Sequence, residues 1–229
     1  MSVNVDTVYQ RVLAILNKEQ RGFLTPQEFN LFANQAQMDL FEQYFYDVNQ
    51  FGRIHGNDTE YSDMLNILNE KINLFATSAS LAYSVDHFPR PADMYRLGTI
   101  IYNNAEAERV NRNEYLYIKA SPIAAPGDAF PIFTEYNEGY NVFGNNEITT
   151  GVTCQYIKTP TDAEWADLKV GDGVPAYNAA ASTNFELHES EETELVVKIL
   201  QLAGVLVREM ALYQVGAQEE AKNTQQEKA

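Results

Sequence analysis

The spacing of apolar residues changes period twice along this 229-residue chain. Up to about residue 76, apolar side chains recur every three or four positions, which predicts amphipathic helices. From residue 77 they alternate with polar side chains in short runs, which predicts strands. After Ser190 the helical period returns. We therefore expect a β-rich stretch inserted between two helical parts of the chain.

Three helices are expected in the N-terminal part, over residues 5–18, 25–51 and 58–76. The second helix has the clearest start, because Thr25 can serve as N-cap, Pro26 fills the first helical position and Glu28 lies three residues after the cap. This is the pattern of a capping box with a proline start. Gly52 follows the apolar stripe and is expected to end the helix. For the first helix, Asp6 is an acceptable cap.

Proline, glycine and asparagine turns divide the β-rich part into short runs. Runs at this spacing predict an antiparallel sheet or a small barrel. The strands are expected at residues 81–88, 94–102, 114–120, 130–136, 140–144 and 151–158. Residues 159–184 are expected to form a loop, with a short helical turn over 162–168.

A long C-terminal helix is expected from Ser190, as its cap, to about residue 221. Burying its stripe against the first three helices gives an α+β fold class. In this fold, a helical bundle of three N-terminal helices and the long C-terminal helix carries an inserted antiparallel β-rich region. The expected parts are the N-terminal helices (1–76), the β-rich insertion (77–187), the closing helix (188–222) and a flexible tail (223–229).

The chain is strongly acidic, with a formal net charge of −16. Such a surface repels nucleic acid and anionic membranes, although it could line a channel through which DNA slides without binding. Keeping the protein soluble explains the charge equally well. The single cysteine, Cys154, excludes an internal disulfide. No signal peptide and no apolar run of about 18 residues is visible, so a cytosolic product, or a part of something assembled in the cytosol, is expected.

Residues 17–29, NKEQRGFLTPQEF, match part of the template of an EF-hand calcium loop. Gly22 falls on the sixth position and Glu28 on the twelfth. The fifth position, which must supply an oxygen ligand, is Arg21, and a guanidinium group has no acceptor to offer. Because the capping box already explains Glu28, the sequence predicts a capped turn and no calcium site.

No catalytic pattern is visible in the sequence. The three histidines, His55, His87 and His188, lie in separate contexts without metal-ligand spacing. Asp86 and His87 are neighbours in an expected strand and should therefore face opposite sides. We expect no enzyme activity, no cofactor and no metal.

Several segments resemble head-to-tail connector proteins of tailed bacteriophages, including the ring proteins of crAss-like podoviruses. Residues 25–45, TPQEFNLFANQAQMDLFEQYF, resemble the N-terminal helices of connector subunits. The run FPRPADMYRLGTIIYN is similar to a stretch that here contains Pro91, Asp93, Met94, Tyr95 and Arg96. A tyrosine, a proline and a tryptophan that recur in the family correspond to Tyr156, Pro160 and Trp165. Residues 185–222 resemble the closing helix.

The resemblance implies a structural virion protein in the neck or tail, assembled in the cytoplasm of the bacterial host. Such subunits form a homo-oligomeric ring, often a dodecamer, below the portal protein. The ring extends the DNA channel without binding DNA specifically and docks the tail, and it has no membrane partner. Other expected partners are neighbouring neck and tail ring proteins. The candidate assembly residues are Tyr213, Gln214, Gln218, Trp165, Tyr95 and Arg96. The segment 213–229 is expected to contact a neighbouring ring or the portal, and acidic side chains are expected to line the channel.

Other functions remain open on the sequence. The chain could be a different virion subunit, such as a tail-tube, nozzle or fibre-attachment protein. It could also be a cytosolic module that binds calcium or another ligand, or an enzyme whose site has no recognisable motif. Trp165 could anchor an interface or could equally cover the β-rich part.

Overall fold

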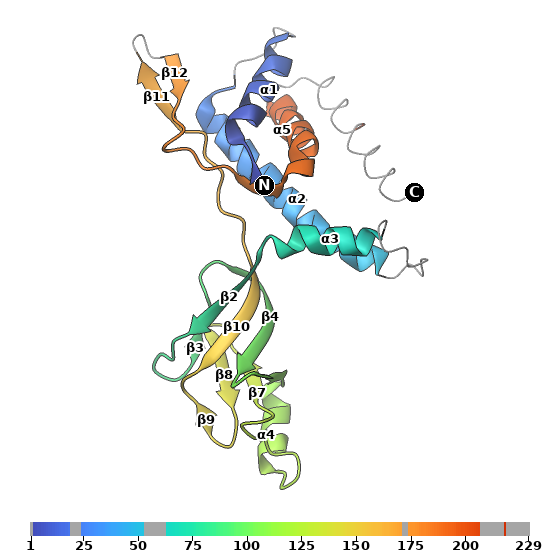
Figure 1. Cartoon of the computed structure of the whole chain (residues 1–229), viewed down its shortest axis with the longest axis vertical. Coiled ribbons are helices and arrows are strands. Elements are labelled where there is room, and N and C mark those ends of the chain that lie inside the picture. Colours follow the sequence, from blue (N-terminus) through green and yellow to red (C-terminus); the bar gives the residue numbers. More distant parts are fainter. Residues whose placement is uncertain (1, 19–23, 53–62, 171–173, 207–217, 219–229) are drawn as a thin grey trace. The chain divides into compact units, whose positions relative to one another are not determined.

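The computed structural model describes residues 2–18, 24–52, 63–170, 174–206 and 218. The chain divides into two compact units (Figure 1). Unit 1 combines Met1–Leu74 with Pro160–Ala229, and unit 2 is Phe75–Thr159.

Four α-helices form most of the described part of unit 1. They are α1 (Val5–Lys18), α2 (Pro26–Phe51), α3 (Met64–Asn73) and α5 (Glu192–Leu206), and a 3-10 turn, Glu189–Glu191, leads into α5. Helix α5 contacts α1 and α2, and α3 contacts α2. The buried side chains of α1 recur at helical spacing, which is what places one apolar face in the core. No helix in the described ranges is long and apolar enough to cross a lipid bilayer.

Helix α2 begins and ends as the sequence predicts. The Oγ1 atom of Thr25 accepts a hydrogen bond from the N–H of Glu28 at 3.3 Å, and Glu28 Oε2 accepts one from the N–H of Thr25 at 2.9 Å. The capping box is therefore confirmed, and the residue at the twelfth position of the calcium template serves as a cap. At the other end, the N–H of Gly52 donates to the carbonyl of Val48 at 2.9 Å.

Helix α1 also has the predicted bounds, but its cap differs from the prediction. The Oδ1 atom of Asn4 accepts hydrogen bonds from the N–H groups of Asp6 at 2.9 Å and Thr7 at 3.0 Å. Asn4 is therefore the N-cap, and Asp6 lies in the first turn of the helix. Asparagine is as good an N-cap as aspartate, and here its side chain bonds the unpaired N–H groups two and three residues further on.

Two small antiparallel sheets also belong to unit 1. They pair β1 (Ser2–Val3) with β13 (Phe185–His188), and β11 (Asp167–Val170) with β12 (Val174–Tyr177). The predicted helical turn over residues 162–168 is wrong, because this segment is extended and Glu164 forms a bridge with Thr183.

Amide side chains on one face of α2 hold the extended segment that precedes β11. Asn30 accepts a hydrogen bond from the N–H of Trp165 at 2.9 Å and donates one to its carbonyl at 3.2 Å. Asn34 accepts from the N–H of Ala163 at 2.7 Å. Gln37, which is buried, continues the row, and its Nε2 donates a hydrogen bond to the carbonyl of Thr161 in the same segment. The row 30, 34, 37 follows the helical repeat, so a single face of α2 supplies hydrogen-bond partners to this backbone.

The predicted fold class is wrong. The protein is a mixed α/β structure, and its described residues form five α-helices and thirteen strands in four sheets. The helices are not arranged as an N-terminal bundle closed by a long C-terminal helix. The physical reason lies partly in α2, whose amide-bearing face binds strand backbone. The expected continuation of the last helix beyond Leu206 lies outside the described residues, apart from the helical residue Gln218.

Three other boundaries in unit 1 differ from the predictions. The third helix ends at Asn73, because Phe75 and the residues after it enter the sheet of unit 2. Its expected start at residue 58 lies outside the described residues, but Asp63, which was expected inside the helix, is its N-cap. Ser190 is not the cap of α5, because it lies inside the preceding 3-10 turn, where its N–H donates to Nδ1 of His188 at 3.2 Å.

Unit 2 consists of two sheets and one helix (Figure 1). The first sheet has the order β2 (Ala76–Leu81), β10 (Val152–Lys158), β4 (Met94–Tyr102), β5 (Ala105–Glu106). The second has the order β3 (Phe88–Pro89), β8 (Gly139–Phe143), β7 (Ile132–Glu135), β6 (Glu108–Arg109), with β9 (Glu147–Ile148) also paired to β8. Helix α4 is Arg112–Ala120. All pairings are antiparallel except that of β6 with β7, which is parallel.

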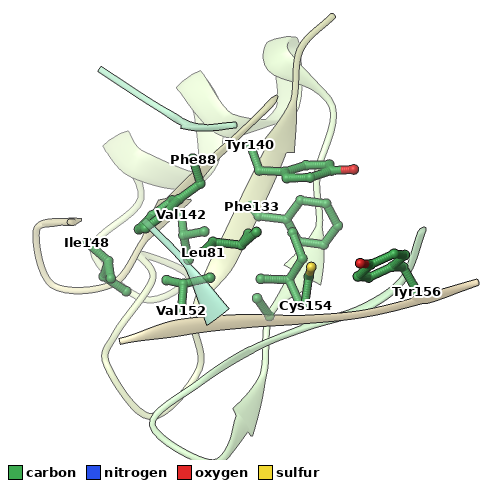
Figure 2. Packing of buried hydrophobic residues seen from close by; sticks show 11 residues of the cluster. Leu81, Phe88, Phe133, Tyr140, Val142, Ile148, Val152, Cys154 and Tyr156 are labelled. Atoms are coloured by element: carbon green, nitrogen blue, oxygen red, sulfur yellow. The ribbon is translucent and has the colours of Figure 1, made fainter. Parts of the chain in front are cut away.

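The core of unit 2 gathers side chains from both sheets (Figure 2). The rings of Phe133 and Tyr140 meet edge to face, with their centres 6.0 Å apart. Cys154 lies in the same core and is fully buried. The predicted strands at 94–102, 130–136, 140–144 and 151–158 are confirmed as β4, β7, β8 and β10. Alternation identified them because each has one face in this core.

Hydrogen bonds of Asp93, Met94 and Tyr156 help to hold unit 2 together. The hydroxyl of Tyr156 donates to Oδ1 of Asp93 at 3.0 Å, and the hydroxyl of Tyr140 donates to Sδ of Met94 at 3.1 Å. The N–H of Thr159 donates to the carbonyl of Asp93 at 2.8 Å. Packing and hydrogen bonding are therefore sufficient to explain these positions.

Two predicted strands of unit 2 are wrong. The run at 81–88 leaves the sheet after Leu81 and makes a turn in which Val85 has φ 56°. The run at 114–120 is helix α4. Its alternating apolar residues fit either structure, but Asn111 and Glu114 have the spacing of a cap and its N3 partner, and this signal identifies the helix.

Candidate assembly surface

Helix α4 is short and remains at the surface of unit 2. Glu114 Oε2 accepts hydrogen bonds from the N–H of Asn111 at 3.2 Å and from its Nδ2 at 3.3 Å, which fixes the start of the helix. None of the nine helical residues is buried. Isolated helices of this length are marginal in water, so α4 depends on contacts with the sheet beneath it.

Two aromatic contacts hold α4 against the β7–β8 hairpin. The ring of Tyr115 stacks on Phe143, with centres 4.2 Å apart and planes 23° apart. The guanidinium carbon of Arg112 lies 3.8 Å from the ring centre of Tyr136. Phe143 alternates with core residues along β8, so α4 covers the face of the hairpin that points away from the core.

The outer side of α4 and the loop after it expose large apolar side chains. The exposed fractions are 65% for Leu116, 79% for Tyr117, 96% for Ile123 and 82% for Phe130. We call these four residues the apolar ridge. Single exposed apolar residues are ordinary, whereas a contiguous exposed apolar patch is typical of a surface that binds another protein. The four ridge residues lie within residues 116–130 of the chain.

The loop that carries Ile123 and Phe130 is held by its own hydrogen bonds. The Oγ atom of Ser121 accepts from the N–H of Ile123 at 3.4 Å. The carboxylate of Asp128 accepts from the N–H of Asn145 at 3.0 Å and from its Nδ2 at 2.9 Å. A surface that is already ordered loses less conformational entropy when it binds.

The charge around the ridge differs from that of the rest of the chain. Residues 108–130, which include the ridge, contain three basic side chains and three acidic ones. The basic residues are Arg109, Arg112 and Lys119, and the acidic ones are Glu108, Glu114 and Asp128. Unit 2 as a whole has nine acidic and six basic residues, whereas the remainder of the chain has 23 acidic and 10 basic residues. The ridge therefore lies in a part of the chain without net charge, in a protein that is strongly acidic as a whole.

The candidate assembly residues from the sequence fall in different places. Tyr95 and Arg96 lie on β4 and are exposed. Trp165 is 3% exposed, and its Nε1 donates to Oδ1 of Asp6 at 2.9 Å. Gln218 is exposed and helical. Tyr213 and Gln214 lie outside the described residues. None of the ridge residues was among the candidates, although the run LYIKASPI shows apolar side chains in an otherwise polar turn region.

One acid–base pair forms that the sequence did not predict. His87 Nδ1 lies 2.8 Å from Asp86 Oδ1, because both residues belong to the turn after β2 and not to a strand. The pair lines a shallow pocket with Arg112, Tyr136 and other residues. No Ser, Thr or Cys side chain is found among the described residues that line this pocket.

The other reactive side chains of the described part have structural surroundings. Burial raises the pKa of the Cys154 thiol, which disfavours the nucleophilic thiolate. Nδ1 of His188 accepts the N–H of Ser190, and His55 lies outside the described residues. Within the ranges that the structure describes, no group of three or more His, Cys, Asp or Glu side chains could hold a metal ion.

Comparison of the sequence with protein-family models and with curated proteins gives no match.

Proposed function

We propose that this chain is a structural virion protein, a subunit of a head-to-tail connector ring that lies below the portal, extends the DNA channel and docks the tail. The observation that carries the proposal is the apolar ridge of unit 2. Four large apolar side chains are exposed over residues 116–130, on a helix and loop held in place by stacking and hydrogen bonds. A protein that remained a monomer would gain nothing from this surface and would be more prone to aggregate.

The charge of the chain supports a position on the DNA path. A net charge of −16 repels the phosphate backbone, so DNA could pass through a ring of such subunits without being retained. We include in the proposal that acidic side chains line this channel. The ring is homo-oligomeric, often a dodecamer in the family that the chain resembles, and its location is the neck or tail of the virion.

The neighbours in this proposal are the portal and other ring proteins of the neck and tail. The segment 213–229, which includes the candidate residues Tyr213 and Gln214, is proposed to contact one of them. The ring has no enzymatic role, cofactor or membrane partner, and it assembles in the cytoplasm of the host.

Co-expression with the portal protein of the same genome, followed by negative-stain imaging, tests the proposal. We expect a second ring stacked on the portal. The variant Leu116→Ser/Tyr117→Ser should leave the portal bare, because it removes apolar area from the ridge that assembly would bury. Both side chains are exposed, so the free energy of unfolding should change by no more than about 0.5 kcal/mol.

Leu168→Ser is the matched control, because Leu168 is also an exposed leucine but lies in unit 1. This variant should still form the second ring. A bare portal beside free wild-type protein would contradict a position directly on the portal. An unchanged ring with the ridge variant would show that the ridge is not the assembly surface.

A further inference from the structure

Strand β2 forms an open border of the first sheet of unit 2 (Figure 1). It pairs with β10 in an unbroken register, and its sequence, ATSASL, contains no charged residue and no proline. Because the carbonyl of Phe75 accepts from Lys158 of β10, alternation directs the backbone polar groups of the even-numbered residues away from β10. These residues are Ala76, Ser78 and Ser80, and their side chains are exposed. No partner for their N–H groups is found among the described residues.

Open strand edges can pair with another chain, and proteins ordinarily protect them by short length, charge, proline or an irregular register. The other open edges in the described part of the chain have such protection. Strands β1, β3, β5, β6 and β9 have two residues each, β11 begins with the exposed Asp167, and β12 contains a proline. The part of β4 beyond β5 carries Arg96 and two register shifts, and in β13 the N–H of Glu186 donates to Oε1 of Gln37 at 3.1 Å. Among the described strands, β2 alone lacks all of these protections.

The core of unit 2 is incompletely covered along this edge. Ile100, Cys154 and Ala79 form one row across β4, β10 and β2 on the side of the sheet that faces the core. Ile100 and Cys154 are fully buried, whereas Ala79, at the edge, is only partly buried. A further strand beside β2 would cover Ala79, so the edge can accept both hydrogen bonds and packing from another chain.

We propose that β2 of one copy pairs antiparallel with β2 of a second copy, about a twofold axis that passes between the two Ser78 residues. In this register Ser78 lies opposite Ser78 and Ala76 lies opposite Ser80, and each such pair exchanges two hydrogen bonds. On the side that faces the core, Thr77 of one copy lies opposite Ala79 of the other. The two sheets then form one continuous sheet, with only small side chains where the copies meet.

The charge of the chain favours a second copy as the occupant of this edge. Each copy has a net charge of −16, so two copies repel each other, and they can approach best where charge is absent. Strand β2 has no charged residue, and β10 beside it has only Lys158. The edge also matches itself, since small uncharged side chains meet small uncharged side chains, and a twofold contact requires such a match.

The inference goes beyond the proposed function, because it concerns two free copies and not the ring. A connector ring on the portal repeats a head-to-tail contact, whereas this contact is twofold, so either can fail without the other. The contact adds backbone hydrogen bonds but buries little apolar area. We therefore expect a weak dimer, which forms at submillimolar concentration and dissociates at low micromolar concentration.

Sedimentation velocity of the full chain over this range of concentration tests the contact. Wild type should change from monomer to dimer as the concentration rises. Ser78→Lys places like charges directly opposite each other at the twofold axis, so the dissociation constant should rise about tenfold or more. At low micromolar concentration this variant should melt at the wild-type temperature, since the side chain of Ser78 is exposed.

Gln155→Lys is the matched control for Ser78→Lys. Gln155 is exposed and lies opposite Ser78 on the same face of the sheet, but β10 is paired on both sides. The control changes the net charge of the chain by the same amount, and it should dimerise as wild type does.

Cysteine cross-linking tests the register. The Cα atoms of the two Ser78 residues would lie about 5.5 Å apart, which is within the range of a disulfide. Oxidation with copper phenanthroline should therefore cross-link Ser78→Cys into a dimer, but not Ser80→Cys, because the two copies of residue 80 are four positions apart in this register. A mixture of Ala76→Cys and Ser80→Cys should cross-link, because these residues face each other. Cys154 is buried and should not react.

The following outcomes would overturn the inference. Wild type that stays monomeric at submillimolar concentration would show that a second copy does not occupy the edge. If that monomer binds the portal and Ser78→Lys does not, the edge belongs to the portal. A dimer that Ser78→Lys and Gln155→Lys weaken equally, or not at all, would lie on another surface. Cross-linking of Ser80→Cys as readily as Ser78→Cys would exclude the proposed register.

Discussion

At the scale of single residues, burial decides which side chains are available for function. Trp165 was a candidate interface residue because tryptophan is frequent in interfaces. In the structure the centre of its ring lies 4.3 Å from that of Tyr9. Its backbone N–H is hydrogen-bonded to Asn30 and its indole nitrogen to Asp6. Composition could not reveal this, because the partners lie more than one hundred residues away in the sequence. Leu116 and Tyr117, by contrast, are ordinary apolar residues that the fold leaves exposed.

The capping box of α2 predicts a pH-dependent contribution to stability. Hydrogen bonds from Thr25 lower the pKa of the Glu28 carboxyl below its usual value. A carboxyl with a lowered pKa in the folded state stabilises the fold above its unfolded-state pKa, and this contribution is lost as pH falls through the folded-state pKa. Thr25→Ala should therefore cost about 1 kcal/mol at neutral pH, and less in acid.

The measurement is the free energy of urea unfolding, for wild type and Thr25→Ala, as a function of pH. Thr25→Ser keeps a hydroxyl that can cap and serves as control. If the free energies of unfolding of wild type and Thr25→Ala differ by the same amount at every pH down to strongly acidic values, that result would contradict the role assigned to the Glu28 carboxylate.

At the scale of elements, local signals define helices better than short strands. The bounds of α2 follow from its cap, its proline and its terminal glycine, all of which lie within a few residues of the ends. Helix α4 was misjudged because its apolar residues alternate, although Asn111 and Glu114 mark its start. Strand β1, which has two residues, has no local signal, because it forms only by pairing with Phe185–His188.

We expect two neighbouring proline substitutions in strand β2 to differ in how much they lower the stability of the protein. Among the described strands, β2 pairs with β10 alone. The carbonyl of Phe75 accepts from the N–H of Lys158 at 2.9 Å, so alternation directs the N–H of Ala79 toward β10 and that of Ser78 toward the open edge. Ala79→Pro removes a ladder hydrogen bond, whereas Ser78→Pro does not.

We expect Ala79→Pro to lose about 1 kcal/mol or more of stability beyond the loss for Ser78→Pro. Both variants impose the same restriction on the backbone angle φ, so each is the control for the other. Thermal unfolding followed by circular dichroism measures the difference. Equal losses, or a larger loss for Ser78→Pro, would mean that the register of β2 is shifted by one residue.

At the scale of the whole molecule, the chain separates into two units that can be studied apart. Unit 2 is a continuous segment, and its two ends meet where Lys158 donates to Phe75. Its core is drawn from its own strands (Figure 2). A segment with adjacent ends and its own core has the properties of an independently folding domain.

We therefore expect residues 75–159, expressed alone, to fold and to unfold cooperatively in urea. Dispersed amide signals in a proton–nitrogen NMR spectrum would report the fold, and slow exchange of the amide of Cys154 would report the core. The variant Phe133→Ala in the same fragment is the control and should lose several kcal/mol. A fragment without a cooperative transition would show that unit 2 depends on unit 1.

The sequence by itself determined the features that depend on neighbouring residues. These are the bounds of α1 and α2, the strands with one face in the core of unit 2, the acidic charge and the poor fit of residues 17–29 to a calcium loop. The tertiary structure alone decided the four sheets, the burial of Trp165 and the exposure of the apolar ridge. The physical reason is that pairing and burial depend on residues far apart in the chain. Capping and periodicity depend on residues within one or two turns of each other.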